Sequence, residues 1–286
     1  MRIPTSSPVV VGVNGTAAGL AAVRLGAREA VSRGRQLRIV HAFTWPGPNV
    51  DGYDEARQTA SRILEEAAAT AQRSTPGVRV DPQLVDGLPD RVLIQLSRTA
   101  EMVILGDDDV GSAPSLPITS VLVQTAARAF CPVVVARGPR PTAGPVVAAV
   151  DGSPWSVLAL RHAALEARRL GVIVEAVLVV ERPGLRAEDE ARRILAATVG
   201  AVGELGRRSR TRLLTGEAGA ALARASTRAR MIVLGPRGTH GSTLLGSVAR
   251  RMLHHGACPT VFVHGPALPV QRLPIRTTRP SNAPAR

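Results

Sequence analysis

A glycine-rich segment in the second half of the chain has the residue types of an anion-binding loop. It spans residues 235–242, with the sequence GPRGTHGS, and Gly246 and Ser247 then open an expected helix. Glycines let backbone N–H groups approach an anion closely, and a helix N-terminus that carries a hydroxyl supplies further donors. Glycine loops also occur at strand-to-helix turns without ligands, so the segment by itself predicts either a phosphate site or a structural turn. Arg237 could pair with a phosphate oxygen or remain solvated.

A carboxylate, Asp151, follows the apolar segment Val146 to Val150 and precedes a helix expected from Trp155. One interpretation is structural, because Asp151 or Ser153 can accept hydrogen bonds from the first N–H groups of that helix. The other is functional, because a carboxylate at the carboxyl end of a central strand can accept hydrogen bonds from a ribose or a base edge. The residues alone leave both interpretations open.

The absence of lysine excludes several kinds of catalytic site. All 36 basic residues of the 286-residue chain are arginines. A Walker A loop, a protein kinase and a pyridoxal-dependent enzyme each require a lysine, so none of these can be present. The histidines lack metal-ligand spacing, and no residue stands out as a nucleophile or general base. We therefore expect a protein that is not an enzyme.

The two cysteines, Cys131 and Cys258, occur just before the last expected strand of each half. Thiols at such positions are typical of small buried side chains rather than of a disulfide framework or a zinc site. The chain also contains no run of about 18 apolar residues and no signal-peptide pattern. We therefore expect a cytoplasmic protein with no membrane span.

The chain contains two copies of one sequence pattern. Pro8 to Gly34 matches Pro145 to Gly171 at a constant offset of 137 residues. The offset becomes 129 at the MVILG and MIVLG segments and 127 at the two Cys-Pro pairs, as expected when loops differ slightly in length. We therefore predict one domain at residues 1–140 and a second at 141–265, with a Pro- and Gly-rich linker from Arg137 to Pro145.

Short apolar runs alternate with longer helical periodicities in each copy, which predicts alternating strands and helices. Continuous apolar strands are typical of parallel sheets that helices cover on both faces. We therefore predict an α/β fold with two tandem, doubly wound, parallel five-stranded sheets, whose ligand sites lie beyond the carboxyl ends of the strands. In the second copy the predicted strands are Val146 to Val150, Ile173 to Val180, Arg210 to Leu214, Met231 to Leu234 and Thr260 to Val263, and the predicted helices are Trp155 to Leu170, Glu188 to Leu205, Ala218 to Arg228 and Ser247 to His255.

The last strand of each copy is apolar and would leave an unprotected edge if its sheet ended there. These strands lie within Cys131 to Ala136 and Thr260 to His264. We expect the two edges to pack against each other, which gives an intrachain pseudo-dimer. Association of whole chains into a homo-oligomer is an alternative or additional arrangement.

Four short segments match the sequence signature of one known family. They are Val-Asp-Gly-Ser at 150–153, Met-Ile-Val-Leu-Gly at 231–235, Gly-Ser-Val at 246–248 and His-His-Gly-Ala-Cys-Pro at 254–259. Together they resemble the universal stress proteins in their tandem form, and the resemblance covers Pro8 to His264. It implies a Rossmann-like fold of the adenine nucleotide alpha hydrolase-like type. By similarity to the ATP-binding members, it implies nucleotide contacts at Asp151, Val179, Gly235, Gly238, Gly246, Ser247 and Val248, with Val179 facing the adenine.

The two copies depart from that family's nucleotide loop in different ways. In the second copy seven residues separate Gly238 from Gly246, where the family pattern has nine. In the first copy the loop keeps its length, but Asp109 and Thr119 replace glycines and Asn14 replaces the strand-end aspartate. Asp109 belongs to an acidic run of three aspartates at 107–109. The repulsion between one such carboxylate and a phosphate charge costs about 3 kcal/mol at ~5 Å and an effective dielectric of ~20. We therefore expect at most one ATP per chain, in the second domain, or AMP or ADP where the shorter loop weakens binding.

The resemblance also implies a role for the chain. A universal stress protein of this kind would be a regulatory protein of the stress response that binds ATP or another adenine nucleotide, with Mg²⁺ accompanying the phosphates. The alternative is an interaction module of the same fold that binds no nucleotide. A slow ATPase is a third interpretation, but no residue stands out as its general base.

The chain is strongly basic, with a net charge of +14, which could favour contacts with nucleic acid. Aromatic residues make up only 2% of the chain, however, and no recognised nucleic-acid motif occurs, so we do not expect nucleic-acid binding. Residues 266–286 contain prolines and arginines without an acidic residue. We expect them to form a disordered basic tail.

Overall fold

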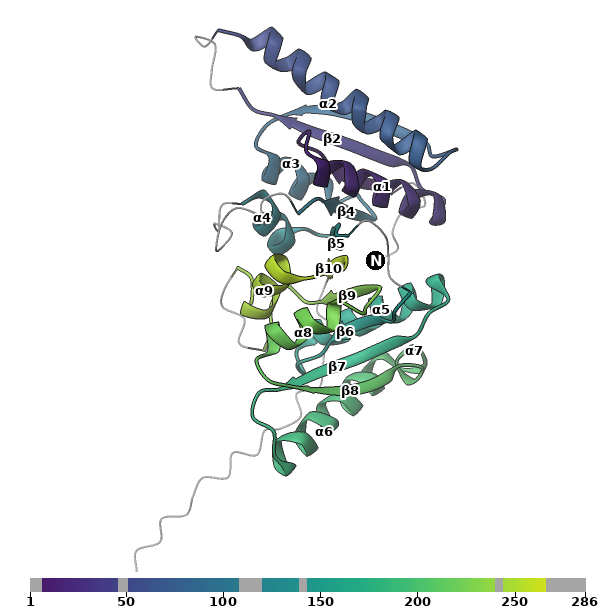
Figure 1. Ribbon diagram of the computed structural model, residues 1–286, viewed down its shortest axis with the longest axis vertical. Helices are drawn as coiled ribbons and strands as arrows, with labels where there is room; N and C mark the ends of the chain where they lie inside the picture. The colour runs from purple at the N-terminus through teal and green to yellow at the C-terminus, as the bar shows by residue number, and fades with distance from the viewer. Residues whose placement is uncertain (1–6, 46–50, 108–119, 139–142, 240–243, 266–286) are drawn as a thin grey trace, which may run out of the picture.

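The computed structural model describes residues 7–45, 51–107, 120–138, 143–239 and 244–265; the expected tail at 266–286 lies outside them. The described strands form one ten-stranded sheet that runs the length of the molecule in the order β3-β2-β1-β4-β5-β10-β9-β6-β7-β8 (Figure 1). The elements of the first half are β1 (Val9–Gly12), α1 (Ala17–Ser32), β2 (Leu37–Phe43), α2 (Tyr53–Ser74), β3 (Val80–Asp86), α3 (Pro89–Leu96), β4 (Met102–Leu105), α4 (Val121–Arg128) and β5 (Val133–Val135). Those of the second half are β6 (Val146–Ala149), α5 (Pro154–Leu170), β7 (Val174–Val180), α6 (Leu185–Val202), α7 (Glu204–Arg207), β8 (Arg210–Thr215), α8 (Ala218–Ser226), β9 (Met231–Leu234), α9 (Ser247–His255) and β10 (Thr260–Phe262).

Aliphatic side chains build the interior strands. Val9, Val10 and Val11 of β1 are each at most 1% exposed, although successive side chains of a strand point to opposite faces of the sheet. Both faces must therefore be covered, and they are: α1, α2, α5 and α6 pack on one face, and α3, α4, α8 and α9 on the other (Figure 1). Among the described helices, none is both long enough and apolar enough to cross a lipid bilayer.

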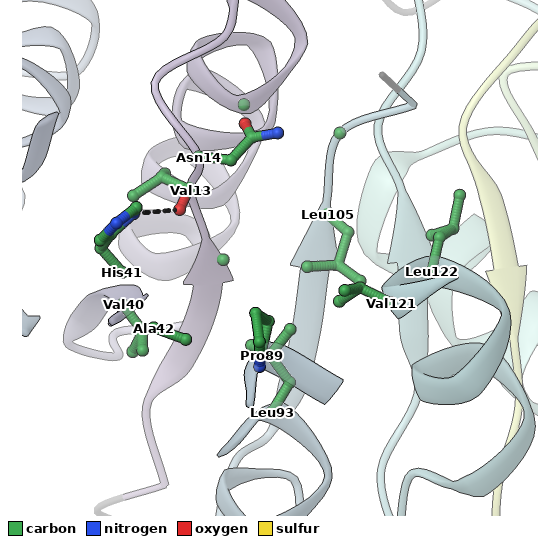
Figure 2. A pocket seen from close by; sticks show the side chains of 13 residues that line it. Val13, Asn14, Val40, His41, Ala42, Pro89, Leu93, Leu105, Val121 and Leu122 are labelled. Carbon is green, nitrogen blue, oxygen red and sulfur yellow. Dashed lines mark hydrogen bonds between the residues drawn. The ribbon is translucent and has the colours of Figure 1, made fainter. Parts of the chain in front are cut away.

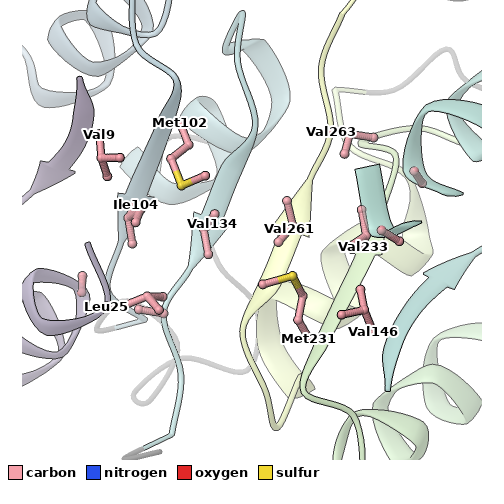
Figure 3. Close-up of a cluster of buried hydrophobic side chains, with 14 of the residues drawn as sticks. Val9, Leu25, Met102, Ile104, Val134, Val146, Met231, Val233, Val261 and Val263 are labelled. Atoms are coloured by element: carbon pink, nitrogen blue, oxygen red, sulfur yellow. The ribbon is translucent and has the colours of Figure 1, made fainter. Parts of the chain in front are cut away.

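The two halves join through their last strands, which pair antiparallel. Val134 of β5 lies opposite Val261 of β10, and Val133 lies opposite Phe262, whereas the other strand pairs of the sheet are parallel. The predicted pairing of these two edges is thus confirmed, and the two predicted five-stranded sheets are one continuous sheet. We call the junction of β5 and β10 the seam. Core side chains line both sides of it, with Val134 and Val261 next to each other (Figure 3).

The predicted strands of the second half are confirmed to within one residue at each end. The helix predicted from Glu188 to Leu205 is wrong in detail, because it is two helices, α6 and α7. Gly203, with φ +74°, separates them, and this left-handed backbone does not continue a helix. Unlike the interior strands, β8 is not buried on both faces. This edge strand has exposed Arg210 and Arg212, and charged side chains discourage pairing with another chain.

The predicted linker from Arg137 to Pro145 is wrong at its first residue. Arg137 is only 7% exposed and directly follows the seam. It donates hydrogen bonds to backbone carbonyls of α9 in the second half. Arg137 therefore belongs to the contact between the two halves rather than to a solvated connection.

A cluster of charged side chains joins α1 to α5 across the seam. Glu29 and Glu166 occupy equivalent positions in the two copies, and each pairs with arginines from both halves. Arg33 contacts Glu166 at 2.6 Å and Glu29 at 3.0 Å, and Arg169 contacts Glu29 at 2.7 Å and Glu166 at 2.8 Å. Burial alone would raise the pKa of Glu166, but the nearby positive charges, Arg33 foremost, hold it below its usual range.

Candidate functional site

The residues expected to contact a nucleotide all line one cavity in the second half. The cavity measures about 590 Å³ and lies where β6, β7 and β9 end and α9 begins. Its lining includes Asp151, Val179, Gly235, Gly238, Gly246, Ser247 and Val248. The sheet order places β7 on one side of β6 and β9 on the other, so the cavity lies at the switch point where sheets of this kind bind ligands. Its volume is typical of small-molecule sites, which span roughly 300–1,000 Å³.

Asp151 is held by one carboxylate oxygen. Its Oδ1 accepts hydrogen bonds from Ser153 N at 3.0 Å and from Ser156 Oγ at 2.5 Å. The cap of α5 is Ser153 itself, whose Oγ accepts from Ser156 N at 3.3 Å. Oδ2 receives no hydrogen bond from the described residues and lies toward Gly238. The two hydrogen bonds to Oδ1 therefore orient the side chain, and Oδ2 remains as an acceptor for a ligand.

Two glycines of the loop are required because neighbouring side-chain atoms lie close to them, not because of their backbone torsion angles. None of Gly235, Gly238 and Gly246 has a positive φ. A Cβ on Gly235 would lie 2.4 Å from Trp155 Cβ, and a Cβ on Gly238 would lie 2.6 Å from Asp151 Oδ2. A Cβ on Gly246 would meet only ordinary contacts of 3.6 Å or more. The described residues therefore leave space for a side chain at 246, and that side chain would extend into the cavity that Gly246 lines.

The N-terminal end of α9 opens into the cavity. Gly246 is the N-cap and provides no side-chain hydrogen bond to the helix, while Ser247, Val248 and Ala249 of the first turn line the cavity. Gly246 N donates to Pro236 O at 2.9 Å, which ties the helix start to the loop after β9. The first N–H groups of a helix and its dipole attract anions. This end of the cavity can therefore bind a phosphate.

Arg237 and Glu181 are charged residues of the same cavity lining. Arg237 Nε is buried and finds no hydrogen-bond partner among the described residues. A buried guanidinium N–H without a partner is unfavourable and would be satisfied by a ligand oxygen. We did not predict Glu181 from the sequence, although its place directly after β7 is a signal that could have identified it. Ser153 was one of the two caps predicted for this helix and is the cap observed, whereas we did not predict that Ser153 N and Ser156 Oγ hold Asp151.

The first half has a smaller pocket at the equivalent position (Figure 2). It measures about 160 Å³, and mostly aliphatic side chains surround it, including Leu93, Leu105, Val121 and Leu122. Asn14 stands in the place of Asp151, and its Oδ1 accepts from Thr16 Oγ1 at 2.7 Å. His41 Nδ1 donates to Val13 O at 2.9 Å, and Gly19 replaces Ser156.

The acidic run of the first loop is described only at Asp107, since Asp108, Asp109 and Thr119 lie outside the described residues. Asp107 Oδ2 contacts Arg137 Nε at 3.4 Å. Its charge is therefore compensated inside the protein, and its repulsion of a phosphate is smaller than we expected for an unpaired carboxylate.

The chain matches a model of the universal stress protein family twice, over residues 6–137 and 143–264. The chain belongs to the universal stress protein family. It is 33% identical over 290 residues to the universal stress protein Rv2005c of Mycobacterium tuberculosis. That alignment covers 88% of this chain and 95% of the relative. It is 29% identical over 286 residues to a universal stress protein of Mycolicibacterium smegmatis, covering 91% and 97%.

The fold of this universal stress protein is similar to that of solved structures. A universal stress protein from Archaeoglobus fulgidus superposes with a TM-score of 0.71 at 17% identity, covering 91% of this chain and 98% of that one. A second structure, from Pseudomonas aeruginosa, gives a TM-score of 0.58 at 18% identity. At such identities the similarity shows the fold alone.

The two cysteines of this universal stress protein do not have the environment of a reactive thiol. Cys131 and Cys258 are buried, and burial raises the pKa of each thiol to about 12. Thiols with so high a pKa are poor nucleophiles at neutral pH. No group of three His, Cys, Asp or Glu side chains in the described part of the chain is arranged to hold a metal ion.

Proposed function

We propose that this universal stress protein binds an adenine nucleotide in its second half and acts as a regulatory protein of the stress response. One observation carries the proposal: the residues that the resemblance to ATP-binding family members implies, from three strand ends and one helix start, line a single cavity of about 590 Å³. We assign residues 1–140 and 141–265 as the two domains. The described part of the second domain contains an oriented carboxylate, a glycine loop and an open helix N-terminus around that cavity.

Each part of the cavity suits one part of a nucleotide. The free Oδ2 of Asp151 accepts hydrogen bonds from the ribose hydroxyls. Val179, at the end of β7, provides an apolar surface for the adenine ring. The loop from Gly235 to Gly238 and the first turn of α9 bind the phosphates through backbone N–H groups, and Arg237 adds a positive charge.

ATP, ADP and AMP differ in the number of phosphates that this loop must hold. The loop is two residues shorter than the family pattern, which removes one or two N–H donors, each contributing about 1.5–3 kcal/mol to a charged acceptor. Arg237 offsets part of this loss. Mg²⁺ would accompany ATP, bound to its phosphates. We therefore assign an adenine nucleotide as the ligand, with ATP as the first to test.

The proposal predicts one nucleotide per chain. Titration calorimetry of the full chain with ATP, ADP and AMP measures the stoichiometry. Asp151→Ala should weaken binding at least tenfold, and Gly246→Val should weaken it by filling the phosphate end of the cavity. Asn14→Ala, the matched change at the equivalent position of the first half, should leave it unchanged.

Two nucleotides per chain would overturn the assignment of the first half. No binding at millimolar concentrations of all three nucleotides would overturn the proposal and favour an interaction module that binds no nucleotide. Release of ADP or phosphate from ATP during the titration, lost in Asp151→Ala, would show an ATPase instead.

A further inference from the structure

Arg137 and His264 occupy equivalent positions in the two copies, 127 residues apart, and each reaches a helix of the other half. Arg137 Nη1 donates to Met252 O at 2.5 Å, and its Nη2 donates to Leu253 O. His264 Nε2 lies 3.0 Å from Ala126 O. Since Ala126 is the equivalent of Leu253, α4 and α9 are capped reciprocally across the seam.

The helix that Arg137 caps begins at the proposed nucleotide site. α9 has nine residues and is therefore only about 13 Å long. Ser247 and Val248 at its start line the cavity, while Met252 and Leu253 near its end are 0% exposed. Because a helix this short behaves as a rigid unit, the position of its end determines the position of its start.

Gly256 gives independent evidence that the capping contact is specific. It follows α9 with φ −63°, a value open to other residues. A Cβ at this position would lie 2.5 Å from Arg137 Nη1, so the absence of a side chain makes room for the guanidinium. The equivalent residue in the first half is Ala129.

The charge of Arg137 suits the end of a helix. Gly256 N donates to Met252 O at 3.2 Å, but the last carbonyls of a helix are incompletely paired and the helix dipole is negative at that end. Arg137 Nε also contacts Asp107 Oδ2 at 3.4 Å, and Asp107 directly follows Gly106 of the first pocket. The guanidinium thus connects the loop after β4 in the first half to the helix at the second cavity.

We propose that Arg137, a residue of the first half, is a positioning residue for the nucleotide site of the second half. It fixes the end of α9 and so the placement of the N–H groups that bind the phosphate. This inference rests on the proposed nucleotide site. It also gives the tandem arrangement a function, because the second site is complete only when the first half is present.

The test compares variants of the full chain by nucleotide titration and by hydrogen exchange. Arg137→Gln keeps a hydrogen-bond donor but removes the charge, and should weaken ATP binding about three- to tenfold. Arg137→Lys restores the charge and should bind within about twofold of wild type. The same Arg137→Gln change should speed amide exchange in α9 without ligand. His264→Gln, the matched control, should alter exchange in α4 and leave ATP binding unchanged.

Wild-type affinity and unchanged α9 exchange in Arg137→Gln would overturn the inference. Equal losses of binding in Arg137→Gln and His264→Gln would also overturn it, since they would show general loosening of the seam. If the wild type binds no nucleotide, both the proposed function and this inference fail, whatever the rate of amide exchange in α9. If the wild type binds and Arg137→Gln binds equally well, only this inference fails. Melting temperatures of all variants separate these effects from unfolding.

Discussion

Asp151 and Gly238 face each other so closely that the Asp151 Oδ2 atom lies 2.6 Å from the point where a Cβ on residue 238 would stand. Asp151 cannot easily retreat, because Ser153 N and Ser156 Oγ both hold its Oδ1. Gly238 has no positive φ, so contact alone excludes a side chain there. The pair joins the two ends of the proposed nucleotide site, the ribose end and the phosphate end.

Gly238→Ala should therefore weaken adenine nucleotide binding at least tenfold, because it displaces either the carboxylate or the loop. The fold should remain, since the substitution lies at the rim of a cavity rather than in the core. Titration calorimetry and thermal unfolding measure the two effects. Gly200→Ala on α6 is the control: it has open space around it, and should keep wild-type affinity while stabilising the protein by about 0.5–1 kcal/mol. Unchanged affinity in Gly238→Ala would contradict the proposed geometry.

The sequence predicts the parts of this protein that depend on local pattern. Runs of valine such as Val9 to Val11 predict buried parallel strands, and the repeat predicts the second half from the first. The residues that line the cavity were expected from short segments that resemble the universal stress proteins. These features are encoded within a few residues of one another, so a single chain is enough to locate them.

The pairing of β5 with β10 was predicted, but the polar side-chain contacts between the halves were not, because they depend on how two distant segments meet. Nothing near Arg137 in the chain indicates that its guanidinium lies against α9, and its Pro- and Gly-rich surroundings predict a linker instead. Likewise, the alignment matches Glu29 with Glu166 without revealing that they share two arginines. The break at Gly203 was missed because α6 and α7 together keep one apolar periodicity.

Glu166 should be one of the residues most important for joining the two halves. It is 4% exposed and lies 2.6 Å from Arg33 of the first half. Glu166→Gln leaves the partly buried guanidiniums of Arg33 and Arg169 without full compensation, and should lower the free energy of unfolding by about 3 kcal/mol. Urea denaturation measures this change.

A surface ion pair provides the control for that prediction. Glu204 and Arg208 lie 3.6 Å apart, but their side chains are 80% and 73% exposed. Glu204→Gln should therefore change the free energy of unfolding by less than about 0.5 kcal/mol. Similar effects for the two substitutions would show that the cluster at the seam does not stabilise the contact between the halves.

The thiols should be inert in the native protein. Burial raises the pKa of Cys131 and of Cys258 to about 12, and only the thiolate reacts with alkylating reagents. At pH 8 we expect slow labelling by iodoacetamide, and rapid labelling of both cysteines in denaturant, where the pKa returns to about 8.5. Mass spectrometry counts the labels. Rapid labelling of either thiol without denaturant would contradict its burial.

His264 is a neutral side chain at the seam. Burial lowers its pKa to about 4, the carbonyls it contacts offset part of that shift, and the charge of Arg237 lowers it further. Its Nε2 faces Ala126 O at 3.0 Å and its Nδ1 faces Phe262 O at 3.1 Å. A neutral ring has one N–H and can donate to only one of these carbonyls. Protonation would satisfy both, but it would place a charge where little water reaches.

Acidification should therefore weaken the protein through His264. The unfolded chain binds this proton below about pH 6.5, whereas the folded protein does not bind it until about pH 4. Between these values the unfolded state holds more protons, so stability falls as pH falls, by at most about 1.4 kcal/mol per pH unit. His264→Gln cannot take up the proton, so its stability should decline less than that of the wild type between pH 7 and pH 5. Urea denaturation at each pH measures both proteins, and parallel pH profiles would show that His264 does not carry this dependence.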